Sequence, residues 1–296
     1  MEHLEHRDSM IMKLIYHPIF RIILGMVIVV SATGLIKSYI TKPFFSSIIQ
    51  SETVIKVFVA LLGTLVMTLT YYFFTKYYEK REVTELSFKS SFLELFGGFW
   101  LGLGVIALEF FLLFCIGNYK ILDFEGFDLL TAPFTFLIGA AMLEELVFRG
   151  ILYRILEQWK GTTVALIVSG VLFELPHLLN PNVAVIGSIG GIVFGLLMGI
   201  MFTYTKRIWL PFSFHLGWNL AQPIFGSNLT GLDQFGVLFK AEFSGSEIVT
   251  GSAMGIEDSI FSLITLIVLF IVFYLKSKKK KHLVSYRNVE GKVLED

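Results

Sequence analysis

Charged residues are scarce in this sequence of 296 residues. Only 16% of them are Asp, Glu, Lys or Arg, whereas 55% are hydrophobic, and the mean hydropathy is +0.73. This composition excludes a water-soluble domain, because such domains carry about 25% charged residues. The sequence therefore predicts an integral membrane protein, with the lipid bilayer as a partner.

Cysteine and net charge are also lacking. The single cysteine, Cys115, cannot form an intrachain disulfide, and a zinc or iron–sulfur site built from cysteines is excluded. The 24 basic and 24 acidic residues cancel, which argues against nucleic acid as a partner. Function has to be sought among the few polar residues that interrupt the apolar runs.

Apolar runs long enough to cross a bilayer dominate the chain. A spanning helix needs about 20 mostly apolar residues. About eight runs qualify, near 18–36, 54–75, 94–116, 132–153, 162–179, 184–204, 208–225 and 259–275. We therefore expect an all-α fold, a polytopic membrane bundle of about eight transmembrane helices with the active site inside the bundle.

Lysine and arginine gather in alternate loops, and this asymmetry predicts the orientation of the chain. The other loops, such as 123–128 and 226–258, are acidic or poor in charge. We predict a multi-pass protein of the cell (plasma) membrane with both termini cytoplasmic, although Lys37 and Lys42 weigh mildly against this orientation. The basic positions are Lys76, Lys80, Arg81, Lys89, Lys160, Lys206, Arg207 and the run 276–282.

Ionisable side chains interrupt the apolar runs at a few positions. A charge at bilayer depth costs at least a few kcal/mol, so such residues normally face a protein interior or a water-filled cavity and mark function. They are Glu109, Glu144, Glu145, Arg149, Glu174, His177 and His215, and Asn219 is a polar neighbour of the last.

The stretch MLEELVFRG, residues 142–150, holds three of these charges. Glu145 and Arg149 are four residues apart with the acid first, which favours an ion pair along a helix. Glu144 points about 100° away from that pair and has no partner on the same helix. An unpaired carboxylate in an apolar setting is a candidate general base. The alternative is a purely structural charge cluster that holds helices together.

Two histidines lie in the stretches FELPH, residues 173–177, and HLGWN, residues 215–219. Pro176 loosens the helix just before His177, and irregular backbone at membrane depth is tolerated where it lines a cavity. His215 and Asn219 share one helical face and could stabilise an oxyanion. A lone buried histidine is more often a hydrogen-bonded packing residue, but here a second one occurs.

These groups suit the activation of water in a buried cavity. With a metal, Glu144, His177 and His215 could supply three ligands and leave a fourth position for water, as catalytic Zn²⁺ requires. Without a metal, Glu144 would be the base. The sequence leaves both mechanisms open. A di-iron site that begins with Glu174 and His177 would need a second Glu-x-x-His, which the apolar runs lack.

At these residues the chain resembles the CAAX-protease and bacteriocin-processing (CPBP or Abi) family of intramembrane endopeptidases, which is related to the type II CaaX-prenyl endopeptidases. The family pattern is Glu-Glu-x-x-x-Arg, then Phe-x-x-x-His, then His-x-x-x-Asn or Asp, and it is matched in order over about 130–225. The resemblance implies hydrolysis of a peptide bond in a membrane-associated or lipid-modified (CaaX-like) substrate. It implies a catalytic base at Glu144, a partner at His177, transition-state stabilisers at His215 and Asn219, and support from Glu145, Arg149 and Phe173.

The polar stretch before about residue 90 predicts a division of the chain into three parts. These are 1–90, a two-helix membrane segment without buried polar groups; 91–225, the catalytic helical core; and 226–296, an outer loop, the last helix and a basic cytoplasmic tail. A non-enzymatic transporter or bacteriocin-immunity protein could use the same buried charges for binding. Loss of function on substitution of Glu144 by Gln would favour the enzyme.

Overall fold

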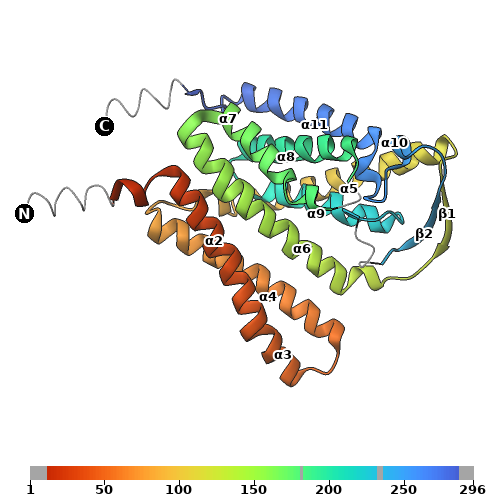
Figure 1. Cartoon of the computed structure of the whole chain (residues 1–296), viewed down its shortest axis with the longest axis horizontal. Helices are drawn as coiled ribbons and strands as arrows, with labels where there is room; N and C mark the ends of the chain where they lie inside the picture. The colour runs from red at the N-terminus through yellow and green to blue at the C-terminus, as the bar shows by residue number, and fades with distance from the viewer. Residues whose placement is uncertain (1–11, 181–182, 232–235, 287–296) are drawn as a thin grey trace, which may run out of the picture.

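The computed structural model describes residues 12–180, 183–231 and 236–286, and helices account for most of it (Figure 1). This confirms the predicted all-α membrane bundle. Within the described residues, six helical segments are long and apolar enough to cross a membrane. They are Pro18–Ile48, Glu52–Tyr78, Ser91–Cys115, Ala132–Leu179, Val185–Thr205 and Ile260–Lys279.

The predicted count of eight spans is not confirmed. The runs predicted at 132–153 and 162–179 lie in one segment, formed by α6 (Ala132–Glu144), the π-helical η5 (Glu145–Tyr153) and α7 (Arg154–Glu174). This segment breaks at Gly161, whose φ of 80° is a left-handed conformation that only glycine adopts readily. The run predicted at 208–225 is α9 (Trp209–Ile224), whose 16 residues fall short of a full span.

An N-terminal hairpin extends away from the rest of the bundle (Figure 1). In it α2 (Pro18–Ile36) continues through η1 (Lys37–Thr41) into α3 (Lys42–Ile48), and α4 (Glu52–Phe73) returns and ends in η2 (Phe74–Tyr78). The expectation that this hairpin lacks buried polar groups is wrong, because Thr33 and Thr75 are buried. The Thr33 hydroxyl donates to the Val29 carbonyl oxygen of its own helix, which makes its burial tolerable. The predicted division at residue 90 stays a prediction.

The helices that carry the predicted motifs are held by close backbone contacts. α9 packs along α5 (Ser91–Cys115), where a side chain at Gly102 or Gly217 would overlap the backbone of the other helix. α8 (Val185–Thr205) packs against both α7 and α11 (Ile260–Lys279). Glycine at these positions allows the helices to approach closely, as at many membrane helix interfaces.

A small two-stranded sheet lies at one end of the bundle, which sequence analysis did not predict (Figure 1). β1 (Tyr119–Phe124) pairs antiparallel with β2 (Phe239–Phe243), with Tyr119 opposite Phe243. The strands are distant in sequence, so hydropathy alone does not reveal the pairing. The short remaining elements are η3 (Thr84–Leu86), η4 (Asp128–Leu130), η6 (His177–Leu179), α10 (Glu247–Thr250) and η7 (Ile256–Asp258).

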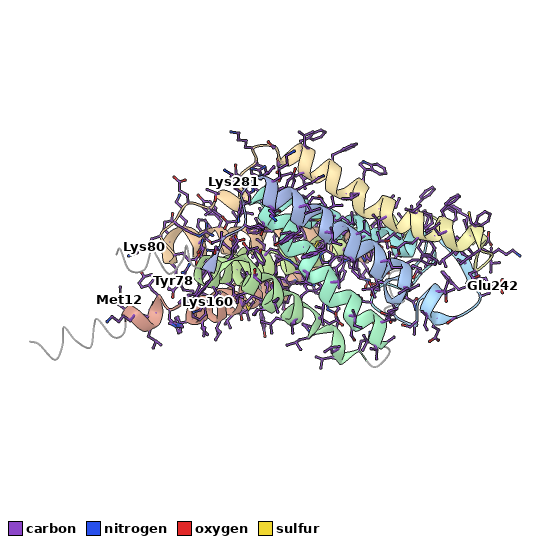
Figure 2. The ribbon with its side chains drawn as sticks, turned by 90° about the horizontal axis from the view of Figure 1, so that it is seen from above. Met12, Tyr78, Lys80, Lys160, Glu242 and Lys281 are labelled. Carbon is purple, nitrogen blue, oxygen red and sulfur yellow. The ribbon has the colours of Figure 1, made fainter. Side chains whose placement is uncertain are left out.

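The two ends of the molecule differ in charge. Figure 2 shows Lys80, Lys160 and Lys281 toward the end that holds Met12, and Glu242 at the opposite end. This separation follows the charge asymmetry of the loops, while the orientation of the termini in a membrane stays a prediction. Some basic residues at this end are neutralised by ion pairs. Arg154, for example, forms a 2.5 Å ion pair with Glu79, whose side chain is 0% exposed.

Candidate active site

A cavity of about 250 Å³ lies inside the bundle, and residues of all three predicted motifs line it. They come from the C-terminal end of α6, from the end of α7 and the turn after it, and from α9. The predicted residues in its wall are Glu144, Phe173, His177, His215 and Asn219. Glu145 and Arg149 are fully buried behind this wall.

His215 lies between the two adjacent glutamates. Its Nδ1 is 3.0 Å from Glu145 Oε1, and its Nε2 is 3.8 Å from Glu144 Oε2. A carboxylate only accepts hydrogen bonds, so Nδ1–H donates to Glu145, and this bond directs Nε2 toward Glu144 and the cavity. The imidazole is therefore fixed by one glutamate and presented to the other.

Glu145 also accepts a hydrogen bond from Arg149, as the spacing in the sequence predicts. Arg149 Nη1 is 3.2 Å from Glu145 Oε1, and Nη2 donates to the carbonyl oxygen of Gly195 on α8 at 3.1 Å. The interpretation of Glu145 as a partner of arginine alone was incomplete, because the same oxygen binds His215. Contacts between α6 and α9 could not be read from spacing within one helix.

Glu144 differs from Glu145 in its access to the cavity. Its side chain is 31% exposed, whereas the side chain of Glu145 is 0% exposed. The π-helical turns begin at Glu145, directly after Glu144. Such turns within α-helices occur often at functional sites. Water in the cavity can therefore reach Glu144 but not Glu145.

His177 lies shortly after the end of α7, in the wall of the cavity. α7 ends at Glu174, two residues before Pro176, which has no N–H to donate to the carbonyl of Leu172. His177 Nδ1 lies 3.1 Å from the carbonyl oxygen of Phe173. Because a carbonyl oxygen only accepts hydrogen bonds, Nδ1 carries the hydrogen, and in this tautomer Nε2 is a hydrogen-bond acceptor.

Phe173 packs against the charged residues of the site. Its ring lies 4.6 Å from the Arg149 guanidinium carbon and 5.3 Å from the His177 ring centroid. Phe194 of α8 stacks on Phe173 and contacts the edge of His215 at 5.0 Å. Phe194 was not singled out from the sequence, since one aromatic residue in an apolar helix carries no signal of its own. The rings of Phe173 and Phe194 thus surround the charged and polar side chains of the site with apolar surface.

Three further carboxylates line the cavity, and two of them come from the segment that was predicted to be an outer loop, on the non-cytoplasmic side of the membrane. Glu174, Glu257 and Asp258 all belong to the wall. Glycines on α8 make room for them, since a Cβ atom at Gly191 would overlap the Glu174 carboxylate and one at Gly187 would overlap that of Asp258. The cavity is thus lined by more polar side chains than the three motifs contain.

A metal site requires at least three suitable side chains close together. Within residues 12–180, 183–231 and 236–286, no three His, Cys, Asp or Glu side chains are grouped so that they could hold a metal ion. The trio predicted as zinc ligands, Glu144, His177 and His215, thus lines one cavity without forming a ligand group, and Glu174 with His177 does not form a di-iron site among these residues. Zinc stays a prediction from residue types alone.

The buried carboxyl of Glu257 in the cavity wall should make the stability of the protein depend on pH. Burial raises the pKa of this carboxyl to about 8, and its Oε2 accepts a 3.1 Å hydrogen bond from Gln222 Nε2. The ordinary pKa of a glutamate is 4.5, so between about pH 4.5 and 8 Glu257 keeps its proton in the folded protein and loses it in the unfolded chain. The stability that the folded protein gains by binding this proton is complete below about pH 4.5 and is lost as pH rises to about 8.

Substitution of Glu257 by Gln should remove this dependence, because the amide stays neutral at every pH. We expect the melting temperature of the variant to exceed that of the wild type by a few degrees at pH 8 and to match it at pH 5. Thermal unfolding in detergent between pH 5 and 8 measures this difference. Glu242→Gln, at an exposed position on β2, is the control and should give a constant difference. A pH-independent difference for Glu257→Gln would contradict the burial of a neutral carboxyl.

Comparison with known proteins agrees with this arrangement. Residues 126–221 match the family model described as type II CAAX prenyl endopeptidase Rce1-like. No curated protein and no solved structure matches the chain. The matched residues contain the three motifs and, with them, Glu144, His177, His215 and Asn219. The match at residues 126–221 therefore supports the resemblance of this part of the chain to the CAAX-protease and bacteriocin-processing family of intramembrane proteases.

Proposed function

We propose that this protein is an intramembrane endopeptidase that hydrolyses a peptide bond in a membrane-associated or lipid-modified, CaaX-like protein or peptide. The observation that carries the proposal is the position of His215, fixed by Glu145 and directed at the more accessible Glu144 in a cavity inside the bundle. A catalytic group that is oriented by a buried carboxylate is a recurring arrangement in hydrolytic enzymes.

In the proposed reaction Glu144 acts as the general base. A water molecule in the cavity attacks the carbonyl carbon of the scissile bond and transfers a proton to Glu144. When the C–N bond breaks, Glu144 returns this proton to the leaving nitrogen, so that an acid and an amine are formed. Nε2 of His177 can accept a hydrogen bond from the water and assist in its orientation.

His215 and Asn219 would stabilise the charge that develops on the carbonyl oxygen. To donate to this oxygen, His215 needs a hydrogen on Nε2 in addition to the Nδ1–H that it donates to Glu145. Asn219 lies one helical turn further along α9 and lines the same cavity, so its amide can act as a second donor.

A cleavage assay tests the reaction class. The purified protein in phospholipid vesicles is incubated with a prenylated CaaX peptide and with the same peptide lacking the prenyl group. We expect mass spectrometry to detect a released C-terminal fragment, with faster release from the prenylated peptide because the lipid concentrates it in the bilayer. If a panel of membrane peptides yields no product, a transporter or immunity protein becomes the better interpretation.

The role of zinc is tested separately. The reaction proposed above uses Glu144 as the base and so needs no metal-bound water. In the described residues the predicted ligands do not form a group. We expect purified active protein to contain no stoichiometric zinc and to keep its activity after treatment with chelators. Stoichiometric zinc together with activity that chelators remove and zinc restores would contradict this mechanism and favour Glu144, His177 and His215 as ligands.

A further inference from the structure

A second hollow, of about 430 Å³, lies between the N-terminal hairpin and the start of α6. Its wall combines residues near the α2–α3 junction, the first turns of α4 and the residues Ala132 and Pro133. It is therefore at the end of α4 opposite to Tyr78 and Lys80, and thus far from the cluster of basic residues at the other end of the molecule (Figure 2). None of the catalytic motifs contributes to it.

Positive charge predominates in this hollow. Lys37, Lys42 and Lys56 line it together with a single acid, Glu52. Lys56 is neutralised by Glu52, because Nζ lies 2.8 Å from Oε1. Among the residues that the structure describes, Lys37 and Lys42 form no ion pair, so the hollow has an excess of two positive charges. An anion is the ligand that these charges favour.

Apart from Ser46, the rest of the wall is apolar. Val59, Ala60 and Pro133 are among its residues, and the hairpin also exposes Phe44 and Phe58. The hairpin helices belong to segments that are apolar enough to cross a membrane. Lys56 lies in the first two turns of its segment, and Lys37 directly follows α2 in the second half of the segment Pro18–Ile48. Long lysine side chains near a helix end can extend toward the lipid headgroups.

We propose that this hollow binds an anionic phospholipid, with the phosphate at Lys37 and Lys42 and an acyl chain along the apolar wall. Basic pockets between membrane helices bind anionic headgroups in this way. A free phosphate ion would use only the lysines, whereas a phospholipid also covers the apolar residues. The site is independent of the proposed peptidase reaction.

The site adjoins the catalytic cavity through one side chain. Phe136 of α6 lines both hollows. It precedes Glu144 by two turns of the same helix, a rise of about 12 Å. A lipid bound at Lys37 and Lys42 would therefore form part of the surroundings of the cavity rather than of a remote surface.

Native mass spectrometry of the full chain in detergent tests the proposal. We expect phosphatidylglycerol to bind more tightly than phosphatidylcholine of the same chain length, and glycerol phosphate without chains not to compete. Exchange of Lys37 and Lys42 for Gln should weaken phosphatidylglycerol binding by about fivefold for each lysine removed. Exchange of both for Arg, which keeps the charge, should retain it.

A matched control removes two lysines elsewhere. Lys278→Gln with Lys279→Gln, at exposed positions in the last turn of α11, should leave the binding unchanged if the hollow is the site. Equal affinity for the two lipids, or equal loss in the control, would overturn the proposal. It would also be overturned if Lys37→Gln with Lys42→Gln left lipid binding intact and instead raised KM for peptides with a free C-terminal carboxylate, which would assign the lysines to the substrate.

Discussion

Substitution of Glu144 by Gln is expected to lower kcat by about 10²–10⁴-fold, the usual contribution of a general base. Glutamine has nearly the same shape but cannot take the proton from the attacking water. The fold should persist, because the Glu144 side chain is 31% exposed and its nearest approach to His215 is 3.8 Å, longer than a hydrogen bond. The peptide assay measures kcat, and thermal unfolding measures the retained fold.

Glu257→Gln is the matched control for this experiment. Its carboxyl lies in the wall of the same cavity, but it belongs to none of the three motifs. We expect this variant to retain cleavage within a few-fold. Full activity of Glu144→Gln would remove Glu144 from the mechanism, and equal losses in both variants would indicate that the total charge of the cavity matters rather than one base.

The helical class and the residues of the cavity could be predicted because each rests on local information. Long apolar runs define membrane helices without any knowledge of their neighbours. The polar residues Glu144, His177, His215 and Asn219 stand out in those runs because charge and polarity at bilayer depth are costly. The structure brings all four to one cavity. Their catalytic roles remain part of the proposal.

Contacts between distant segments could not be predicted in the same way. Spacing within a helix gives the pair of Glu145 and Arg149, but it says nothing about the bond from Glu145 to His215, which joins residues 70 positions apart. Glu257 and Asp258 were assigned to an outer loop because their surroundings in sequence are polar. They reach the cavity because η7 packs against α8.

The same limit explains the uncertain number of spans. The two apolar runs predicted at 132–153 and 162–179 lie on either side of the break at Gly161, within one segment of consecutive helices. Hydropathy counts apolar residues and does not register that α9 is short. α9 does not need a full span of lipid contact, because it is enclosed by α5, α6 and α8 and most of its residues are buried. A helix buried among other helices can have the same hydropathy as a membrane span, although it contacts mainly protein.

Substitution of Arg149 by Met should lower the free energy of unfolding by about 3–5 kcal/mol, the usual result of removing one partner from a buried ion pair. Arg149 and Glu145 are both 0% exposed, and the arginine also donates to the Gly195 carbonyl oxygen and lies over the Phe173 ring. Without it, the charge of Glu145 is left beside His215 alone. Unfolding by sodium dodecyl sulfate measures the loss.

Two further variants separate this charge effect from a loss of packing. Lys56→Met removes the basic member of another pair with the same spacing, but that pair is largely exposed, so little change in the free energy of unfolding is expected. Adding Glu145→Gln to Arg149→Met removes the uncompensated charge and should restore most of the lost stability. Cleavage should stay low in this double variant, because His215 has lost the carboxylate that orients it. If the double variant is no more stable than Arg149→Met, the arginine acts through packing on Phe173, and the ion pair is not what stabilises the site.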